Sequence, residues 1–343
     1  MQDAARTSTT LAGVSASGLG KRFGDLWALR GLDLDVAPAT VLGLLGHNGA
    51  GKTTAIRILT TLSKPTEGSA NVAGLDVVTH AATVRERIGV AAQQATVDGL
   101  MSARLNLRTI GRLGGVSRHV ADARGDELLA RLELTDFADA LVRTYSGGMR
   151  RRLDLAASLM SRPQVLFLDE PTTGLDPRSR NDLWDMLREL VREGCTVILT
   201  TQYLEEADRL ADDIVVLDHG RTVAHGTPAA LKSQIGDDRF DVKLRTDADI
   251  EPALVALAPH CSERPTIDRD ELLLTMSATN GLRLIDVVRA LDKAGIEAVD
   301  ATRRHVTLDD VFLTLTTPSN SLTTPAHNAE TADNSATRSE NAR

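Results

Sequence analysis

Short apolar runs alternate with helical patterns from about residue 14 to residue 235. The runs at 41–45 and 165–168 are almost wholly apolar, which is typical of strands buried on both faces of a sheet. Elsewhere apolar residues recur at helical spacing, as in 183–191 before Gly194. This alternation predicts an α/β fold with a mainly parallel sheet covered by helices.

A helical insertion is expected within this first unit. Residues 95–145 contain helical patches but no buried-strand run, and an apolar helical stripe follows at 149–160. We therefore expect a first domain over 14–235, with a helical subdomain at about 95–160 inserted between strands of its sheet.

The pattern changes near residue 236. Thr227-Pro228 predicts a helix start, because threonine is a common N-cap and proline suits the first helical position. After residue 236 the pattern predicts strand and helix in alternation, at 240–244, 250–257, 271–276 and 284–291. They predict a small α+β accessory domain over 236–317. Residues 318–343 have almost no large apolar side chains, so we expect a disordered tail.

Composition limits the cellular compartment in which this chain is expected and the kinds of partner that it can bind. The 343 residues, 42% of them hydrophobic, allow one full core and a smaller second one. No apolar run approaches the roughly 18 residues that span a bilayer, and the first residues lack the apolar centre of a secretory signal, so we expect a cytosolic chain. Cys195 and Cys261 match no metal spacing, and Cys195 is expected to be buried. A net charge of −8 argues against nucleic acid, and we interpret Arg150–Arg152 as a solvated or interface face of a helix.

The segment Gly46 to Thr53 matches the phosphate-binding loop pattern, between an apolar strand and a helical pattern. A plain glycine-rich turn is the alternative, but both contextual tests are met. Glycines let backbone N–H groups turn toward phosphates, Lys52 would reach the β- and γ-phosphates of ATP, and Thr53 would bind Mg²⁺. The side chain of His47 should point away, because the loop acts through its backbone. The expected nucleotide-binding residues here are Gly46, His47, Asn48, Gly49, Ala50, Gly51, Lys52, Thr53 and Thr54.

Two adjacent carboxylates, Asp169 and Glu170, follow the apolar run at 165–168. The carboxyl ends of parallel strands share one edge of a sheet, where the phosphate loop also lies. We expect Asp169 to act on the magnesium shell and Glu170 to polarise the attacking water as general base. Together with the loop, this pair predicts ATP hydrolysis.

The tripeptide Ser146-Gly147-Gly148 precedes a helical pattern. Ser146 as a simple N-cap would explain it in isolation. A helix N-terminus with two glycines can also accept a phosphate, and the chain already has its own phosphate loop. We therefore expect Ser146, Gly147 and Gly148 to contact an ATP held by a second copy of the chain.

Over about residues 14–235 these motifs resemble the ATP-binding subunit of ABC transporters, a branch of the P-loop NTPase fold. The resemblance implies that Phe23 stacks on adenine, although an aromatic residue beside a strand is often core. It implies that Gln93 links magnesium to a membrane permease, and that Asp176 lies in a loop crossing the dimer interface. Gln202 stands where the wider family usually has a histidine near the γ-phosphate; its amide can donate a hydrogen bond but carries no charge. The implied catalytic set is Glu170, Lys52, Gln202 and Asp176, and the metal set is Thr53, Gln93 and Asp169.

Three further segments, 200–208, 93–98 and 308–313, resemble the daunorubicin-resistance branch of antibiotic exporters. The resemblance implies a separately encoded permease, a homodimer at the cytoplasmic face of the membrane, and outward movement of an amphiphilic compound. Segment 308–313 could instead be an amphipathic helix packed on the small domain. Two other functions stay open: a soluble cassette ATPase uncoupled from transport, and a binding module that uses ATP as a regulatory ligand.

Overall fold

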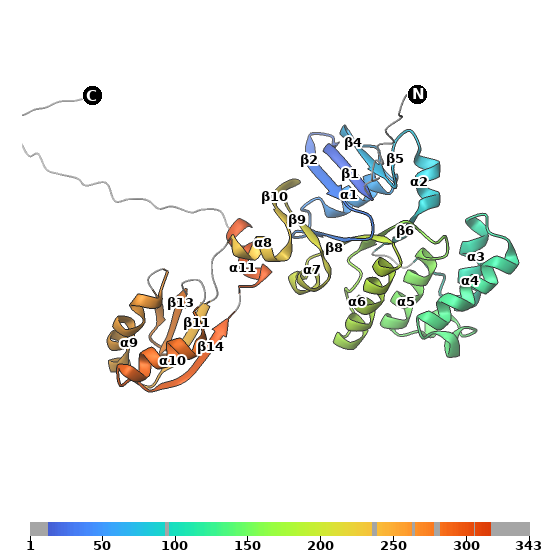
Figure 1. Ribbon diagram of the computed structural model, residues 1–343. Helices are drawn as coiled ribbons and strands as arrows, with labels where there is room; N and C mark the ends of the chain where they lie inside the picture. Colours follow the sequence, from blue (N-terminus) through green and yellow to red (C-terminus); the bar gives the residue numbers. More distant parts are fainter. Residues whose placement is uncertain are drawn as a thin grey trace, which may run out of the picture.

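The computed structural model describes residues 13–92, 96–234, 239–262, 265–277, 282–304 and 306–316 (Figure 1). Gln93 and the expected tail at 318–343 lie outside the described residues. The cassette part is built on a six-stranded sheet in the order β10-β9-β3-β8-β7-β6. Its strands are β3 (Val41–Leu45), β6 (Ile88–Ala91), β7 (Val165–Asp169), β8 (Thr196–Thr201), β9 (Asp213–Asp218) and β10 (Arg221–Gly226). All neighbouring pairs are parallel except β9 with β10, which confirms the mainly parallel sheet.

The two faces of this sheet belong to two different cores, which is why every residue of β3, β7 and β8 is buried. On β7, Leu166 and Leu168 pack toward α5 (Gly147–Ser158) and α6 (Pro177–Arg192). Val165 and Phe167, which alternate with them, pack on the other side with α1 (Lys52–Leu59). A sheet covered on both faces therefore carries the strand ends that bear the candidate site.

A second, antiparallel sheet was not predicted by the sequence. Its order is β2-β1-β4-β5, and it shares the α1 core with the central sheet (Figure 1). Its strands are β1 (Val14–Phe23), β2 (Leu26–Val36), β4 (Glu67–Val72) and β5 (Leu75–Asp76). These strands bury one face only, so polar residues interrupt their apolar pattern.

Helices fill the segment between β6 and β7, as expected. The helices of the cassette are α2 (Ala81–Arg87), α3 (Ala103–Leu113), α4 (Arg118–Arg131), η1 (Thr135–Phe137), η2 (Val142–Thr144) and α7 (Leu204–Leu210), besides α1, α5 and α6. Helix α6 ends just before Gly194, whose φ of 98° suits glycine, and Cys195 is buried beyond it. The domain limits proposed from the sequence stay predictions.

Helix α8 (Pro228–Ser233) is the last helix of the cassette before the C-terminal part, and the Thr227 hydroxyl accepts a hydrogen bond from the Ala230 amide at 3.1 Å, confirming the predicted N-cap. An antiparallel sheet in the order β12-β13-β11-β14 follows and shares a core with two helices. Its elements are β11 (Arg239–Leu244), η3 (Asp247–Asp249), α9 (Ile250–Leu257), η4 (Ala258–His260), β12 (Thr266–Asp268), β13 (Leu273–Ser277), α10 (Leu284–Lys293) and β14 (Ala298–Arg304). Strands β12 and β14 were not predicted, because few of their side chains are buried.

The last described helix, α11 (Leu308–Thr316), packs against α7 and α8 of the cassette. Leu308 and Val311 share an apolar cluster with Ala207 and Leu231, so this helix turns its apolar face to the cassette. None of the described helices is both long and apolar enough to cross a bilayer.

Candidate functional site

The phosphate loop lies between β3 and α1 and lines a cavity of about 490 Å³, together with Ala28 and Glu170. Its first residue must be glycine, because a Cβ on Gly46 would lie 2.4 Å from the Leu217 carbonyl oxygen of β9. The loop therefore rests directly on the end of β9. This close approach fixes where its backbone N–H groups can receive a ligand.

Lys52, the first residue of α1, is buried. Its ammonium group donates to the carbonyl oxygens of Gly46 at 2.6 Å and His47 at 3.2 Å, and it lies 3.9 Å from Glu170 Oε1. Burial lowers the pKa of Lys52, and the nearby carboxylates of Glu170 and Asp169 oppose that shift. The ammonium group of Lys52 is thus held against the phosphate loop, close to the carboxylates of Glu170 and Asp169.

Asp169 ends β7 and is buried. Its Oδ2 accepts a hydrogen bond from the Thr53 hydroxyl at 3.3 Å, and its Oδ1 accepts one from the Thr200 hydroxyl of β8. The hydroxyl and carboxylate that the sequence assigned to magnesium are therefore neighbours. Such an all-oxygen donor set fits Mg²⁺.

Glu170 adopts a φ of 49°, in the left-handed region that non-glycine residues rarely occupy. Its amide donates to the Thr200 carbonyl oxygen at 3.1 Å, which holds the backbone in this conformation. The side chain is 12% exposed and lines the phosphate-loop cavity. The carboxylate is therefore aimed at the space where a γ-phosphate and its attacking water would lie.

Ser146 caps α5, with its hydroxyl accepting from the Met149 amide at 3.2 Å. Gly147 lines a different cavity, of about 310 Å³, which also includes Glu170. Nearby Asp176 caps α6 by accepting from Ser179, and these hydrogen bonds lower the pKa of Asp176. Within one chain, the Ser-Gly-Gly turn and the phosphate loop thus face separate cavities that meet at Glu170.

Two other predicted residues, Phe23 and Gln202, do not line the loop cavity. Phe23, at the end of β1, is 55% exposed, which contradicts the alternative that it is a core residue. Gln202 is an exposed residue just after β8. Neither lines the phosphate-loop cavity among the described residues, and Gln93 falls outside them. The imidazole of His47 is bonded to Asp218 Oδ1 at 2.7 Å.

The family model described as ABC transporter matches residues 29–173. The chain is 54% identical over 304 residues to daunorubicin resistance ATP-binding protein DrrA3 of Streptomyces coeruleorubidus, covering 88% of this chain and 95% of the relative. The chain belongs to the ATP-binding subunits of ABC transporters. Doxorubicin resistance ATP-binding protein DrrA of Mycobacterium tuberculosis is 45% identical over 89% of this chain and 93% of its own. Among solved structures, cbiO1 of Clostridium perfringens, part of the ABC transporter complex cbiONQ, matches with a TM-score of 0.60 and 26% identity over 65% of this chain and 93% of its own.

As a member of this family, the chain is an ATP-binding ATPase. Arg151 of α5 belongs to the run interpreted as a solvated or interface face, and it is partly buried while Arg150 is exposed. The Arg151 guanidinium donates to the carbonyl oxygens of Pro171 at 2.8 Å, Asp169 at 3.1 Å and Glu170 at 3.0 Å. It also donates to Ala92 at 2.8 Å, the last described residue before Gln93. One side chain therefore ties the helix that begins at the Ser-Gly-Gly turn to the loop that carries Glu170.

A buried carboxyl group was also missed. Glu206 of α7 is fully buried and accepts hydrogen bonds from Thr172 Oγ1 at 3.1 Å and Trp184 Nε1 at 3.4 Å. Burial raises the pKa of Glu206. Because Thr172 lies two residues after Glu170, its hydrogen bond to Glu206 stabilises the loop that carries Glu170. A glutamate beside other acidic residues at a helix start carried no signal of burial.

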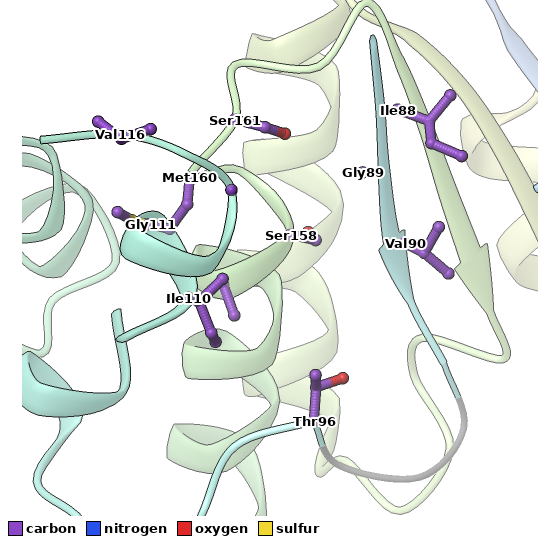
Figure 2. A pocket seen from close by; sticks show the side chains of 12 residues that line it. Ile88, Gly89, Val90, Thr96, Ile110, Gly111, Val116, Ser158, Met160 and Ser161 are labelled. Atoms are coloured by element: carbon purple, nitrogen blue, oxygen red, sulfur yellow. The ribbon is translucent and has the colours of Figure 1, made fainter. Parts of the chain in front are cut away.

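The ABC cassette also has an apolar cavity of about 210 Å³ between β6, α3 and α5 (Figure 2). Ile110, Val116 and Met160 line one side of it, and Val90 of β6 lies opposite. Thr96, the first described residue after 93–95, lines one end of it. This cavity is separate from the nucleotide site.

Proposed function

We propose that this chain hydrolyses ATP to energise the export of an antibiotic or another amphiphilic compound through a separate membrane permease. The names of its relatives support this cargo class, since they are daunorubicin and doxorubicin resistance ATP-binding proteins. The main support for hydrolysis is geometric: Lys52, Thr53 and Glu170 line one cavity, and Asp169 accepts a hydrogen bond from Thr53 beside it. In such a complex the chain works at the cytoplasmic face of the membrane.

The residues around that cavity divide the work of hydrolysis. Loop amides and Lys52 bind the phosphates, and Thr53 with Asp169 would hold Mg²⁺, which neutralises phosphate charge when bound. Glu170 accepts a hydrogen bond from the attacking water as general base. Its constrained backbone keeps that carboxylate in place before substrate arrives.

Two copies of the chain are needed to complete the site. The Ser146–Gly148 turn faces a cavity of its own, so it is free to cap the γ-phosphate of an ATP held by the partner copy. Asp176, which caps α6 next to this turn, would lie at the same interface. ATP then bridges the two copies, and loss of the γ-phosphate removes the bridge.

Glu170→Gln tests the base and the dimer together. The amide keeps the shape but cannot accept the proton, so we expect ATP binding to persist, turnover to fall by about 100-fold or more, and an ATP-bound dimer to accumulate. Phosphate release and mass photometry measure these effects, and Glu205→Gln, on the exposed side of α7, is the matched control. Normal turnover by Glu170→Gln would refute the base assignment, and an ATP-loaded monomer would refute the bridge.

Gln202 needs its own comparison, because its role rests on its place after β8. We expect Gln202→His to raise turnover and Gln202→Ala to lower it, since the first adds a chargeable donor and the second removes the donor. Equal hydrolysis rates in the three proteins would remove Gln202 from the site.

The apolar cavity beside Thr96 is our proposed permease contact. Thr96, which lines it, is three positions after Gln93, the residue that the family resemblance links to the permease, and the lining is mainly apolar. Val116→Asp should abolish copurification with the permease while ATP binding persists. Val255→Asp, at an exposed position of α9, is the control. Unchanged copurification of Val116→Asp would move the contact elsewhere, and the lack of any permease partner for the wild type would favour an uncoupled ATPase.

A further inference from the structure

The turn between β9 and β10 is fixed against the phosphate loop. Asp218 pairs with Arg221, leaving His219 and Gly220 as a two-residue turn with φ values of 45° and 75°. Both values are positive, as in the tight turns that match the twist of a hairpin. The Gly220 amide donates to the Ala50 carbonyl oxygen at 3.0 Å, and the Gly220 carbonyl oxygen accepts from the Arg30 amide at 2.7 Å. The turn is therefore held on both sides, by the loop and by β2.

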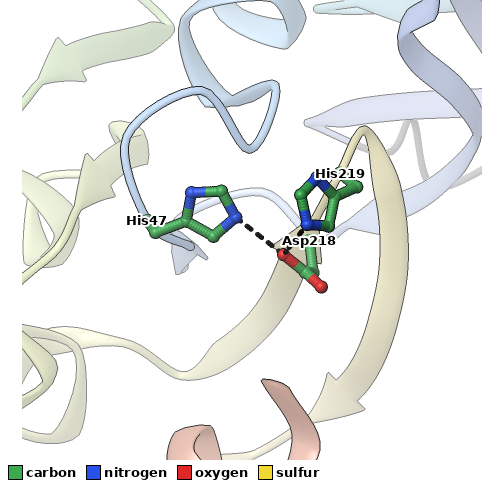
Figure 3. A group of neighbouring side chains, drawn as sticks. All are labelled: His47, Asp218 and His219. Atoms are coloured by element: carbon green, nitrogen blue, oxygen red, sulfur yellow. Dashed lines mark hydrogen bonds and ion pairs between the residues drawn. The ribbon is translucent and has the colours of Figure 1, made fainter. Parts of the chain in front are cut away.

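This arrangement brings together two histidines and one carboxylate (Figure 3). His47 Nε2 lies 2.7 Å from Asp218 Oδ1, and His219 Nε2 lies 3.8 Å from the same oxygen. The two imidazole rings flank the carboxylate, with centroids 5.3 Å apart. One ligand atom from each of the three side chains lies within 4.8 Å of the others.

The hydrogen bond at Nδ1 of His47 leaves Nε2 as the nitrogen that can bind a metal ion. Nδ1 lies 2.7 Å from the Asn48 carbonyl oxygen, which can only accept, so Nδ1 carries the hydrogen. In the neutral ring the lone pair is then on Nε2, which faces Asp218. A metal-binding histidine ordinarily has this second contact, in which its other nitrogen donates to a carbonyl or carboxylate oxygen.

We propose that His47, Asp218 and His219 form a site for a borderline transition-metal ion of the Zn²⁺ class. Two imidazoles and one carboxylate suit such an ion, and they leave a fourth tetrahedral position for water. Ligand atoms about 2.0–2.1 Å from a tetrahedral ion are roughly 3.3 Å apart, between the two distances seen here. The ion replaces the proton shared by His47 Nε2 and Asp218 Oδ1. The site differs in chemistry from the all-oxygen pair of Thr53 and Asp169, which suits Mg²⁺.

Metal binding would join two segments of the chain that are far apart in sequence. His47 belongs to the phosphate loop, while Asp218 ends β9 and His219 begins the β9–β10 turn. The ion would restrain the loop at His47, whose carbonyl oxygen accepts a hydrogen bond from Lys52. Backbone amides of 47–49 and 219–220 should therefore exchange hydrogen more slowly when Zn²⁺ is bound.

The test is calorimetric titration of Zn²⁺ into the nucleotide-free full chain, prepared without a polyhistidine tag. We expect one ion per chain, and a loss of affinity of at least about tenfold in each of His47→Ala, Asp218→Asn and His219→Asn. Asparagine is used at 219 because it tolerates a positive φ, so the turn is kept. With Co²⁺ as the probe, visible absorption bands typical of four-coordinate cobalt should appear in the wild type and be lost in the variants.

Two controls separate this site from other zinc binding. His225 pairs with Asp213 at 2.6 Å on the same hairpin, but within the described residues no third ligand joins that pair. His225→Ala should therefore bind Zn²⁺ like the wild type, and so should Thr53→Ala, which removes a magnesium ligand. Zinc affinity that survives in both His47→Ala and His219→Asn, or that is lost in His225→Ala, would overturn the proposal. Unchanged amide exchange at 47–49 with zinc bound would overturn the restraint of the loop.

Discussion

Arg151 should control both the stability of the cassette and its turnover. In Arg151→Ala the guanidinium is removed, and in Arg151→Lys the charge is kept but the planar donor group is lost. Three of its hydrogen bonds, to the carbonyl oxygens of Asp169, Glu170 and Pro171, are partly buried, and the fourth, to Ala92, is exposed. Burial lowers the pKa of Arg151, but an arginine stays charged in proteins.

The size of the effect follows from those bonds. A hydrogen bond from a charged donor contributes about 1.5–3 kcal/mol, and neighbouring bonds from one group are not additive. We therefore expect Arg151→Ala to lower the free energy of unfolding of the cassette by about 3–4 kcal/mol. For a domain of this size, that loss lowers the melting temperature by roughly 10 °C. Lysine can restore one or two of the bonds, so Arg151→Lys should lose about half as much. A shift of the Glu170 carboxylate by about 1 Å is enough to slow turnover by roughly 100-fold.

Differential scanning fluorimetry and a phosphate-release assay measure the two effects. Arg150→Ala is the matched control, because its exposed neighbouring side chain donates only one long hydrogen bond, to the Arg143 carbonyl oxygen at 3.3 Å. The control should melt and hydrolyse ATP like the wild type. If Arg151→Ala kept the wild-type melting temperature and turnover, the guanidinium would not be what holds Glu170 in place.

Two further predictions concern stability alone. Burial raises the pKa of Glu206 in the folded chain above the ordinary value of 4.5. As pH rises above 4.5, ionisation of Glu206 therefore destabilises the folded wild type. The melting temperature of Glu206→Gln relative to that of the wild type should increase with pH above 4.5. A pH-independent difference would contradict this. Thr227→Ala removes the N-cap of α8 and should lower stability by about 1 kcal/mol in urea titrations, whereas Thr227→Ser should not; equal losses in both would show that the hydroxyl is not the stabilising group.

Local chemistry made much of the fold predictable. Strands β3 and β7 are buried on both faces, so their sequences are apolar up to Asp169 at the end of β7 and could be placed from pattern alone. The caps at Thr227 and Ser146 involve residues three positions apart, and both are seen. The pairing of Thr53 with Asp169 could be expected because β3, which precedes the phosphate loop, and β7, which ends at Asp169, have their carboxyl ends at the same edge of the parallel sheet. The phosphate-contacting role of Ser146–Gly148 stays a prediction.

Tertiary structure alone decided the contacts between segments that are far apart in the sequence. His47 and Asp218 are 171 positions apart, and they meet only because β9 lies beside β3 in the sheet. Arg151 has the same residue type as its exposed neighbour Arg150, yet packing turns it toward the Glu170 loop. Glu206 likewise becomes buried only when α7 packs near Trp184 and Thr172. The sequence by itself determined much of the helical pattern, strands β3 and β7, and the phosphate-loop and carboxylate motifs, because these depend on residue period and local sequence. The partners of charged side chains depend on which distant strands and helices become neighbours.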